Sequence, residues 1–174
     1  LLEPTDSSDG SARNHWEANP GMGYGADVQP ISLGRFEEPV LSLASAFRAR
    51  CVGLYLGGGV VRDLLLGGPD ALESADFDFT TPAVPTQIVE LVEPIATSLW
   101  RQGERFGTIG ARVFGLDVEI TTHRGDRYRA DSRRPEVEFS TEVEADLARR
   151  DFTVNAMAID PLNPGQLIDP FDGR

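Results

Sequence analysis

The sequence predicts an α/β protein in which helices and strands contribute to one core. Three observations support this fold class. Apolar residues recur at helical spacing over residues 33–50, a short apolar run at residues 52–56 is typical of a buried strand, and strict alternation over residues 117–122 is typical of a strand with one polar face. A chain of 174 residues is long enough to bury a core and short enough for one main domain.

The chain divides into a leader and a globular part. Residues 1–31 are rich in Gly, Ser, Asp, Asn and Pro and show no apolar periodicity, so we expect a disordered leader there. The periodic patterns begin after it, and we expect residues 32–174 to form the folded domain.

Each element within that domain is predicted from periodicity, strand propensity or turn residues. Gly67, Gly68 and Pro69 end the second helix, and Pro94 lies inside the third, where it is expected to kink or break it. In chain order we expect a helix at 33–50, a strand at 52–56, a glycine turn at 57–59, a helix at 60–66, a strand at 76–81, a helix at 85–100, a hairpin of strands at 108–113 and 117–122, and a helix at 142–157.

Composition excludes several classes of function. The formal net charge of -12 argues against a general nucleic-acid-binding surface. All 16 basic residues are Arg, so the chain has no lysine for a P-loop, a Schiff base or a covalent nucleotidyl intermediate. Cys51 is alone, which excludes an internal disulfide, and two histidines are too few for a histidine-built metal centre. No apolar run reaches membrane-span length, so we expect no membrane partner and a cytoplasmic protein.

Two closely spaced aspartates are the first candidates for chemistry. On a strand, Asp76 and Asp78 would share one face while Phe77 and Phe79 point into the core. Like charges on one face repel, and a divalent cation between them would remove that repulsion. Oxygen ligands suit Mg2+, and the nearby glycine turn opens a helix, a setting in which backbone N–H groups bind phosphate. The pattern therefore indicates phosphoryl or nucleotidyl transfer.

A third carboxylate can join them if the strand at 117–122 lies beside the strand at 76–81. Asp117 and Glu119 share a face of that strand, and either could contribute. Three carboxylates can hold two metal ions about 3.5–4 Å apart, which stabilises both the attacking and the leaving oxygen of an in-line displacement. The alternative is a solvated polar face on a half-buried strand.

The last expected helix carries a further group of polar residues. Asp151 and Asn155 are four residues apart and would lie one above the other on the helix. Arg150, at the edge of that face, can bind triphosphate oxygens through its planar fork. The alternative is a surface helix with ordinary ion pairs. His123 is expected to be solvated at the end of its strand rather than in contact with phosphate.

A series of short motifs runs from about residue 33 to the end of the chain. The motifs are Gly58-Gly59-x-Val61-Arg62-Asp63, Asp76-x-Asp78, Phe106-Gly107-Thr108, Glu119-Ile-Thr-Thr-x-Arg124, Arg133-Arg134-Pro135, Arg149-Arg150-Asp151-Phe-Thr-x-Asn155-Ala-Met-Ala and Ile168-Asp-Pro-Phe-x-Gly173. In this order they resemble the catalytic head domain of bacterial CCA-adding tRNA nucleotidyltransferases and poly(A) polymerases, the class II branch of the polymerase-beta-like nucleotidyltransferase superfamily.

The resemblance implies a mixed sheet flanked by helices and a metal-dependent transfer of a nucleoside monophosphate from ATP or CTP to an RNA 3′ hydroxyl. It implies that Asp76 and Asp78 bind Mg2+, with two ions present during catalysis, and that Glu119 is the third catalytic carboxylate. The RNA partner is expected to be tRNA, bound mainly by a neck, body and tail beyond residue 174. The nucleotide-binding residues that the resemblance implies are Gly58, Gly59, Arg62, Arg150, Asp151 and Asn155.

The chain departs from the family pattern in two places, and two other functions stay open. Gly57 replaces a bulky apolar residue, and residues 68–74 form a longer connection that we expect to be a surface loop. The alternatives are an enzyme of the same fold that acts on a protein or small molecule, and a non-catalytic nucleotide-binding fragment. The intact carboxylates disfavour the fragment, because a binding module need not keep groups that repel each other.

Overall fold

The computed structural model describes residues 30–125 and 138–174 of the chain. The expected disordered leader lies, except for its last two residues, outside this range. The strands are β1 Tyr55–Gly57, β2 Phe77–Thr81, β3 Ala96–Trp100, β4 Thr108–Val113, β5 Leu116–Thr122, β6 Arg124–Gly125, β7 Glu138–Phe139, β8 Ala158–Ile159 and β9 Leu167–Ile168. The α-helices are α1 Glu37–Arg48, α2 Gly59–Gly67, α3 Pro85–Val92 and α4 Val143–Ala148, and the 3-10 helices are η1 Gly34–Phe36, η2 Gly68–Ser74, η3 Glu104–Phe106 and η4 Thr153–Asn155.

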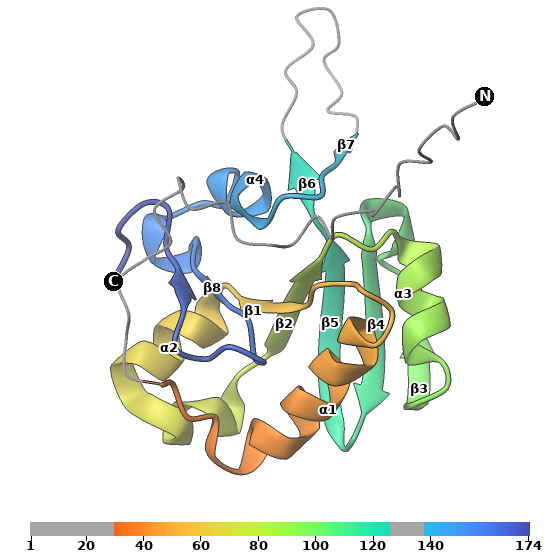
Figure 1. Ribbon diagram of the computed structural model, residues 1–174, viewed down its shortest axis with the longest axis horizontal. Coiled ribbons are helices and arrows are strands. Elements are labelled where there is room, and N and C mark those ends of the chain that lie inside the picture. Colours follow the sequence, from red (N-terminus) through yellow and green to blue (C-terminus); the bar gives the residue numbers. More distant parts are fainter. Residues whose placement is uncertain (1–29, 126–137) are drawn as a thin grey trace, which may run out of the picture.

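The main sheet is mixed and has seven strands in the order β3-β4-β5-β2-β1-β8-β9, as Figure 1 shows for its central strands. Strands β2 and β5 run parallel, and the other neighbouring strands run antiparallel. A parallel pair needs a crossover, and here the chain makes it through α3, β3 and β4. The expected α/β fold with a mixed sheet is confirmed.

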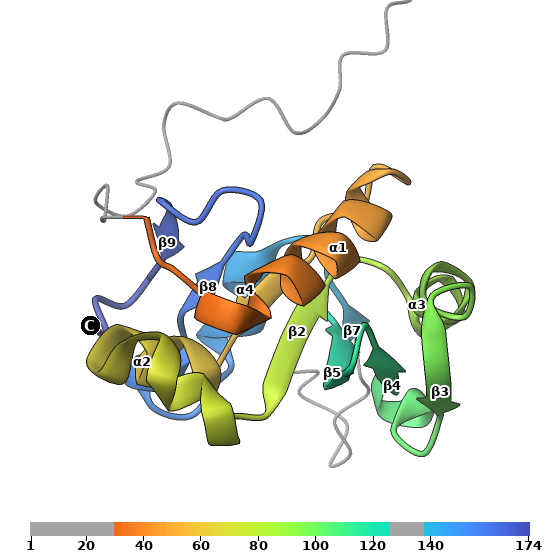
Figure 2. The same cartoon turned by 90° about the horizontal axis from the view of Figure 1, so that it is seen from below.

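The two faces of the sheet are covered differently. Helices α1, α2 and α3 pack on one face and bury the main core, with α1 lying along the sheet in Figures 1 and 2. Phe47 of α1 and Phe79 of β2 are both at most 2% exposed. On the other face, α4 buries Val143 and Leu147 in a small cluster with Ala158. The middle of this second face is therefore open beside α4.

No helix of the described residues is long and apolar enough to cross a membrane.

The break expected at Pro94 is confirmed, but the continuation of the helix to residue 100 is wrong. The helix ends at Val92, and residues Ala96–Trp100 form the edge strand β3. Pro94 lacks the N–H that a continuing helix requires, and its ring clashes with the preceding turn. Ala96 and the residues from Ser98 to Trp100 then pair with β4, with an irregularity at Thr97.

The expected helix at 142–157 is also wrong beyond its first two turns. Helix α4 ends at Ala148, and Phe152 has a φ of 63°, which no helix can contain. The β-branched pair Thr153 and Val154 follows in a 3-10 turn. Asp151 and Asn155 are thus not stacked on one helix face.

The connection at residues 68–74 is more ordered than the expected surface loop. It forms the 3-10 helix η2, and its Leu72 is only 1% exposed in the main core. The extra residues therefore pack beside α2 and anchor it on the side away from the sheet's open face.

Candidate functional site

Two carboxylates lie side by side on the open face of the sheet. Asp78 of β2 is directly opposite Glu119 of β5 in the parallel register. Adjacent strands are about 4.8 Å apart, and opposite residues send their side chains to the same face. Phe77 and Phe79 point to the other face, into the core. The predicted proximity of Glu119 to the aspartate motif is therefore confirmed.

Asp76 approaches this pair from outside the strand. Strand β2 begins at Phe77, and the N–H of Asp78 donates to the carbonyl of Asp76 at 3.1 Å, so the chain turns here instead of alternating. Within the described residues no three His, Cys, Asp or Glu side chains are close enough together to hold a metal ion. The structure thus shows a carboxylate pair, Asp78 and Glu119, with Asp76 exposed beside it.

The charge on Asp78 is unfavourable in its surroundings. Burial raises the pKa of Asp78, and the negative charges of Glu119 and Asp76 raise it further, while the Arg150 guanidinium opposes them. The net direction is upward. A cation bound between the carboxylates would lower this cost, because an opposite charge nearby favours the ionised carboxylate.

Two guanidinium groups lie beside the glycine turn, and one of them, that of Arg150, is also close to Asp78. Gly58 has a φ of 78° and precedes α2, whose first turn no side chain caps. A Cβ at Gly58 would lie 3.0 Å from Nη1 of Arg150 and 4.0 Å from Oδ2 of Asp78, and a Cβ at Gly59 would lie 3.4 Å from Nη2 of Arg62. Glycine at both positions therefore leaves room for an anion to approach the backbone N–H groups and both arginines.

A hydrogen bond joins Arg62 to Asn155, a contact that the sequence did not predict. The Arg62 guanidinium donates to Asn155 Oδ1 at 2.7 Å and to Asp63 Oδ1 at 2.8 Å, which fixes it at the mouth of the turn. Asn155 reaches this place from η4, not from a helix shared with Asp151. Asp151 is exposed and makes no hydrogen bond or ion pair with the described residues.

Asp146 is the site residue that sequence reasoning missed. Its carboxylate is fully buried and accepts hydrogen bonds from Thr80 Oγ1 at 3.2 Å, from the backbone N–H of Arg124 at 3.1 Å, and from the guanidinium groups of Arg149 and Arg150. Thr80 is the next residue after Asp78 on the same face of β2. Asp146 thus holds Arg150 over the carboxylate pair. The signal available in the sequence was its spacing of three and four residues from the two arginines.

Two other polar residues are placed away from the predicted chemistry. Asp117 forms an ion pair with Arg112 at 3.0 Å, two residues from Glu119 towards the β4–β5 turn, so it does not join the aspartates. His123 is fully buried, not solvated as expected, and its ring packs 5.8 Å from that of Tyr55. Burial lowers the pKa of His123 and so favours the neutral imidazole, while the negative charge of Asp146 acts in the opposite direction.

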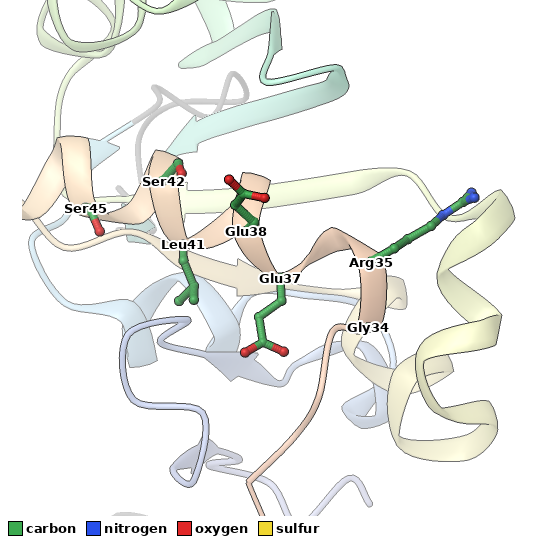
Figure 3. A pocket seen from close by; sticks show the side chains of 7 residues that line it. All are labelled: Gly34, Arg35, Glu37, Glu38, Leu41, Ser42 and Ser45. Carbon is green, nitrogen blue, oxygen red and sulfur yellow. The ribbon is translucent and has the colours of Figure 1, made fainter.

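An open hollow lies elsewhere, on the outer side of α1. Figure 3 shows its lining, in which Arg35, Glu37 and Glu38 extend from the start of the helix and Leu41, Ser42 and Ser45 follow along it. Arg35 is also ion-paired to Glu73 of η2. Helix α1 packs on the core face of the sheet, so this hollow is separated from Asp78 and Glu119 by the core.

The open face therefore combines oxygen ligands with a phosphate-binding turn. Carboxylates lie at its centre, and two fixed arginines and a helix N-terminus lie on one side. This arrangement can bind a polyphosphate together with divalent cations. Charge-assisted bonds from arginine forks and metal ions that neutralise phosphoryl oxygens are the means by which proteins stabilise phosphoryl transfer.

Comparison with known proteins supports this description. The sequence model of one family, the Poly A polymerase head domain, matches residues 54–174, which include every residue of the site. The mitochondrial CCA tRNA nucleotidyltransferase 1 of Homo sapiens is 40% identical over 139 residues, which cover 79% of this chain and 30% of that protein.

Two solved structures share the fold. The Bacillus stearothermophilus CCA-adding enzyme in complex with CTP aligns with a TM-score of 0.63 and 32% identity over 78% of this chain and 30% of that one. The Thermotoga maritima CCA-adding enzyme complexed with tRNA aligns with a TM-score of 0.62 and 27% identity over 87% of this chain and 34% of that one. The chain spans about a third of the length of these relatives.

Replacing Asp146 by Asn should destabilise the fold. Asn keeps the shape but leaves Arg149 and Arg150 without their buried counter-charge, so we expect the free energy of unfolding at pH 7 to fall by roughly 2–4 kcal/mol. The measurement is urea unfolding, with Glu144→Gln on the same helix as the control that changes stability by less than about 0.5 kcal/mol.

The effect of Asp146→Asn should depend on pH in one direction. Burial favours the neutral carboxyl, but the bonds and charges of Arg149 and Arg150 outweigh it and lower the pKa of Asp146. Its stabilising effect is therefore complete above about pH 4 and is lost as the pH falls through the lower pKa of the folded state. The gap between wild type and variant should narrow below about pH 4, and a gap independent of pH would contradict the assignment.

Replacing Asp78 by Asn should stabilise the metal-free protein. Because the pKa of Asp78 is raised in the folded state, ionisation of Asp78 destabilises the folded protein. The free energy of unfolding of the wild type therefore falls as the pH rises through that pKa, and the fall is complete at pH 7. We expect Asp78→Asn to gain about 0.5–1 kcal/mol at pH 7 in EDTA and to gain little at pH 4. Asp117→Asn, on the same face but paired to Arg112, should show no gain. Equal unfolding curves for wild type and Asp78→Asn at pH 7 would show that the repulsion is absent.

Proposed function

This chain belongs to the Poly A polymerase head domain family, and we propose that it carries the catalytic site of an enzyme that transfers a nucleoside monophosphate from CTP or ATP to the 3′ hydroxyl of an RNA. Its homology is to CCA-adding nucleotidyltransferases, so the reaction class we favour is CCA addition to tRNA. The same relatives favour an RNA acceptor over the protein or small-molecule acceptor that the sequence left open.

One observation supports the proposal most strongly. The Asp78–Glu119 pair, the Gly58–Gly59 turn and the Arg150 guanidinium meet at one point of the open sheet face. A nucleotide-binding module would need the turn and the arginine but not the repelling carboxylates. Their presence together favours transfer over binding alone.

The carboxylates fit the metal ions that this family typically uses. Their donor set is oxygen only, which suits Mg2+. Burial and the charges of Glu119 and Asp76 raise the pKa of Asp78, so a bound cation would lower the cost of its negative charge. Asp76 and Asp78 are the residues that would hold Mg2+, with Glu119 as the third catalytic carboxylate and two ions as the family resemblance implies. Glu119 already lies opposite Asp78, and Asp76 would have to move towards this pair to complete the site. When bound, the ions would neutralise the charge that develops on the phosphoryl oxygens and lower the pKa of the attacking hydroxyl.

The protein groups bind and orient the reactants. Arg150 and Arg62 hold the triphosphate, and the backbone N–H groups of Gly59 and Val60 at the N-terminus of α2 bind its oxygens. Gly58 shapes the turn, and its own N–H donates to the carbonyl of Met157 at 3.2 Å. The 3′ hydroxyl of the RNA releases its proton to solvent and its oxygen forms a bond to the α-phosphorus, while the bond from that phosphorus to the bridging oxygen breaks and pyrophosphate leaves. Glu119 is on the far side of Asp78 from the arginines, so we assign the attacking hydroxyl to its side. No covalent enzyme intermediate is needed.

We place most of the RNA-binding surface outside this chain. A net charge of -12 offers few contacts to phosphates, and the relatives that this chain matches are about three times as long.

Asp151 and Asn155 have separate roles in this proposal. Asn155 orients Arg62 through its side-chain oxygen, and Asp151 is exposed, so its carboxylate is accessible to solvent and ligand. We also keep the cytoplasmic location as a proposal.

Binding of Mg-CTP tests the proposal directly. We expect calorimetry to detect CTP binding in Mg2+ and to lose it in EDTA, and label from CTP to enter tRNA lacking its 3′ CCA only in Mg2+. Asp78→Asn and Glu119→Gln should each lower transfer at least about 100-fold. Asp117→Asn is the matched control on β5 and should behave as wild type. Metal-independent CTP binding, or equal losses for Asp117 and Glu119 variants, would contradict the site.

Arg150 should contribute to nucleotide affinity through its fork. Arg150→Ala is expected to weaken CTP binding by about 1.5–3 kcal/mol, because it removes a charge-assisted bond to phosphate. Arg150→Lys should recover only part of this loss, since lysine cannot bond Asp146 and a phosphate in the same planar geometry. Arg149→Ala is the control, because it also loses Asp146 but does not approach Gly58. Wild-type CTP affinity in Arg150→Ala would exclude this role.

A further inference from the structure

A single row of residues crosses the open face of the sheet from its edge to the carboxylates. Trp100 of β3 is opposite Gly110 of β4, Gly110 is opposite Glu119 of β5, and Glu119 is opposite Asp78 of β2. Opposite residues share a face, so Trp100 lies on the carboxylate face. Its neighbour Leu99 points the other way and packs against the core.

The indole of Trp100 occupies the place that a side chain at Gly110 would take. A Cβ on Gly110 would lie 1.8 Å from Nε1, 2.3 Å from Cε2 and 2.4 Å from Cδ1 of Trp100. Gly110 does not have a positive φ, so its backbone does not require glycine. The missing side chain instead lets the indole lie across β4 and point towards Glu119. Glu119 is on the next strand, β5, one strand spacing of ~4.8 Å away.

The indole is available to a ligand. Trp100 is partly exposed, and its N–H donates no hydrogen bond to the residues that the structure describes. A buried tryptophan N–H normally has a partner, and a partly exposed indole beside charged groups is an amphipathic contact surface. The ring thus forms an aromatic wall at the Glu119 end of the site.

The order of groups along the row indicates which reactant meets this wall. The phosphate-binding groups Gly58, Arg62 and Arg150 lie on the β1 side of Asp78, and Trp100 lies on the opposite side, beyond Glu119. The triphosphate and the indole are therefore at opposite ends of the carboxylates. The reactant at the Trp100 end is the one that brings the attacking hydroxyl.

We propose that Trp100 contacts the 3′-terminal nucleotide of the RNA acceptor, with Gly110 providing the space that the indole needs; this inference rests on the proposed function. Aromatic side chains stack on nucleic-acid bases with little regard to sequence, and such a contact strengthens single-strand binding. It orients the terminal ribose so that its 3′ hydroxyl faces Glu119.

The first test separates the two substrates kinetically. With tRNA lacking CCA as acceptor, Trp100→Ala should raise the KM for RNA about 10-fold, a change of about 1.4 kcal/mol, and leave CTP affinity unchanged. Trp100→Phe should restore most of the loss, because it retains an aromatic face. An unchanged KM for RNA, or a loss of CTP affinity instead, would overturn the proposal.

Gly110→Ala tests the same contact without touching the indole. The added methyl group must displace Trp100, so the variant should reproduce the higher KM for RNA. In the Trp100→Ala background there is no indole for the added methyl group to displace. Gly110→Ala should therefore cause no further rise in the KM for RNA. Additive losses in the double variant would show that the two residues act separately and would contradict the proposal. Unfolding midpoints of all variants establish that each is folded.

A fluorescence titration gives a readout that does not require turnover. Trp16 and Trp100 are the two tryptophans of the chain, and Trp16 lies outside the described residues, so Trp16→Phe leaves Trp100 as the reporter. A short single-stranded RNA with a free 3′ hydroxyl should quench or shift its emission, while Mg-CTP alone should not. If Mg-CTP binds by calorimetry but RNA leaves Trp100 emission unchanged, this inference fails and the proposed function stands. If Mg-CTP does not bind, the proposed function itself fails.

Discussion

The parallel pairing of β2 with β5 is the constraint on which the site depends. It sets Asp78 opposite Glu119 while Phe77, Phe79, Val118 and Ile120 on the alternate positions build the core. A slip of one residue would send the carboxylates into the core and the phenylalanines to solvent, so hydrophobic burial specifies the register and the register places the charges. The fold thereby uses the apolar side of the sheet to stabilise an electrostatically unfavourable arrangement on the other.

The positive groups are positioned from the opposite direction, by a buried carboxylate. Asp146 accepts a hydrogen bond from Thr80, which follows Asp78 on the same face of β2. Its bonds to Arg149 and Arg150 hold the guanidinium of Arg150 beside the glycine turn. Arg62 is fixed separately by Asp63 and Asn155. Both arginines that face the turn are therefore anchored by acceptors before any phosphate arrives, which reduces the entropy that binding must offset.

Local patterns predicted much of this structure and long-range contacts the rest. Amphipathic spacing identified α1 and α2, alternation identified β2 and the β4–β5 hairpin, and motif order identified the glycines, carboxylates and arginines of the site. Two helices were extended too far. Leu99 continues the apolar spacing of α3 beyond the break at Pro94, and the second helix was carried past the positive φ of Phe152 although Thr153 and Val154 are poor helix formers. Asp146 and His123 carry no local signal of burial, since their environment comes from β2, β1 and α4 meeting in space. Trp100 was counted with a helix, so its place opposite Gly110 could not be foreseen.

The close fit between Trp100 and Gly110 also limits how this protein can change by mutation. Any side chain at position 110 meets the indole at once, whereas a smaller residue at position 100 leaves only an open surface. The two positions are therefore accessible in one order: the tryptophan must be exchanged before the glycine. A larger residue at position 110 becomes compatible with this sheet only after Trp100 has been replaced by a smaller one. The effect of a substitution at either position therefore depends on the residue at the other, so the two positions are energetically coupled.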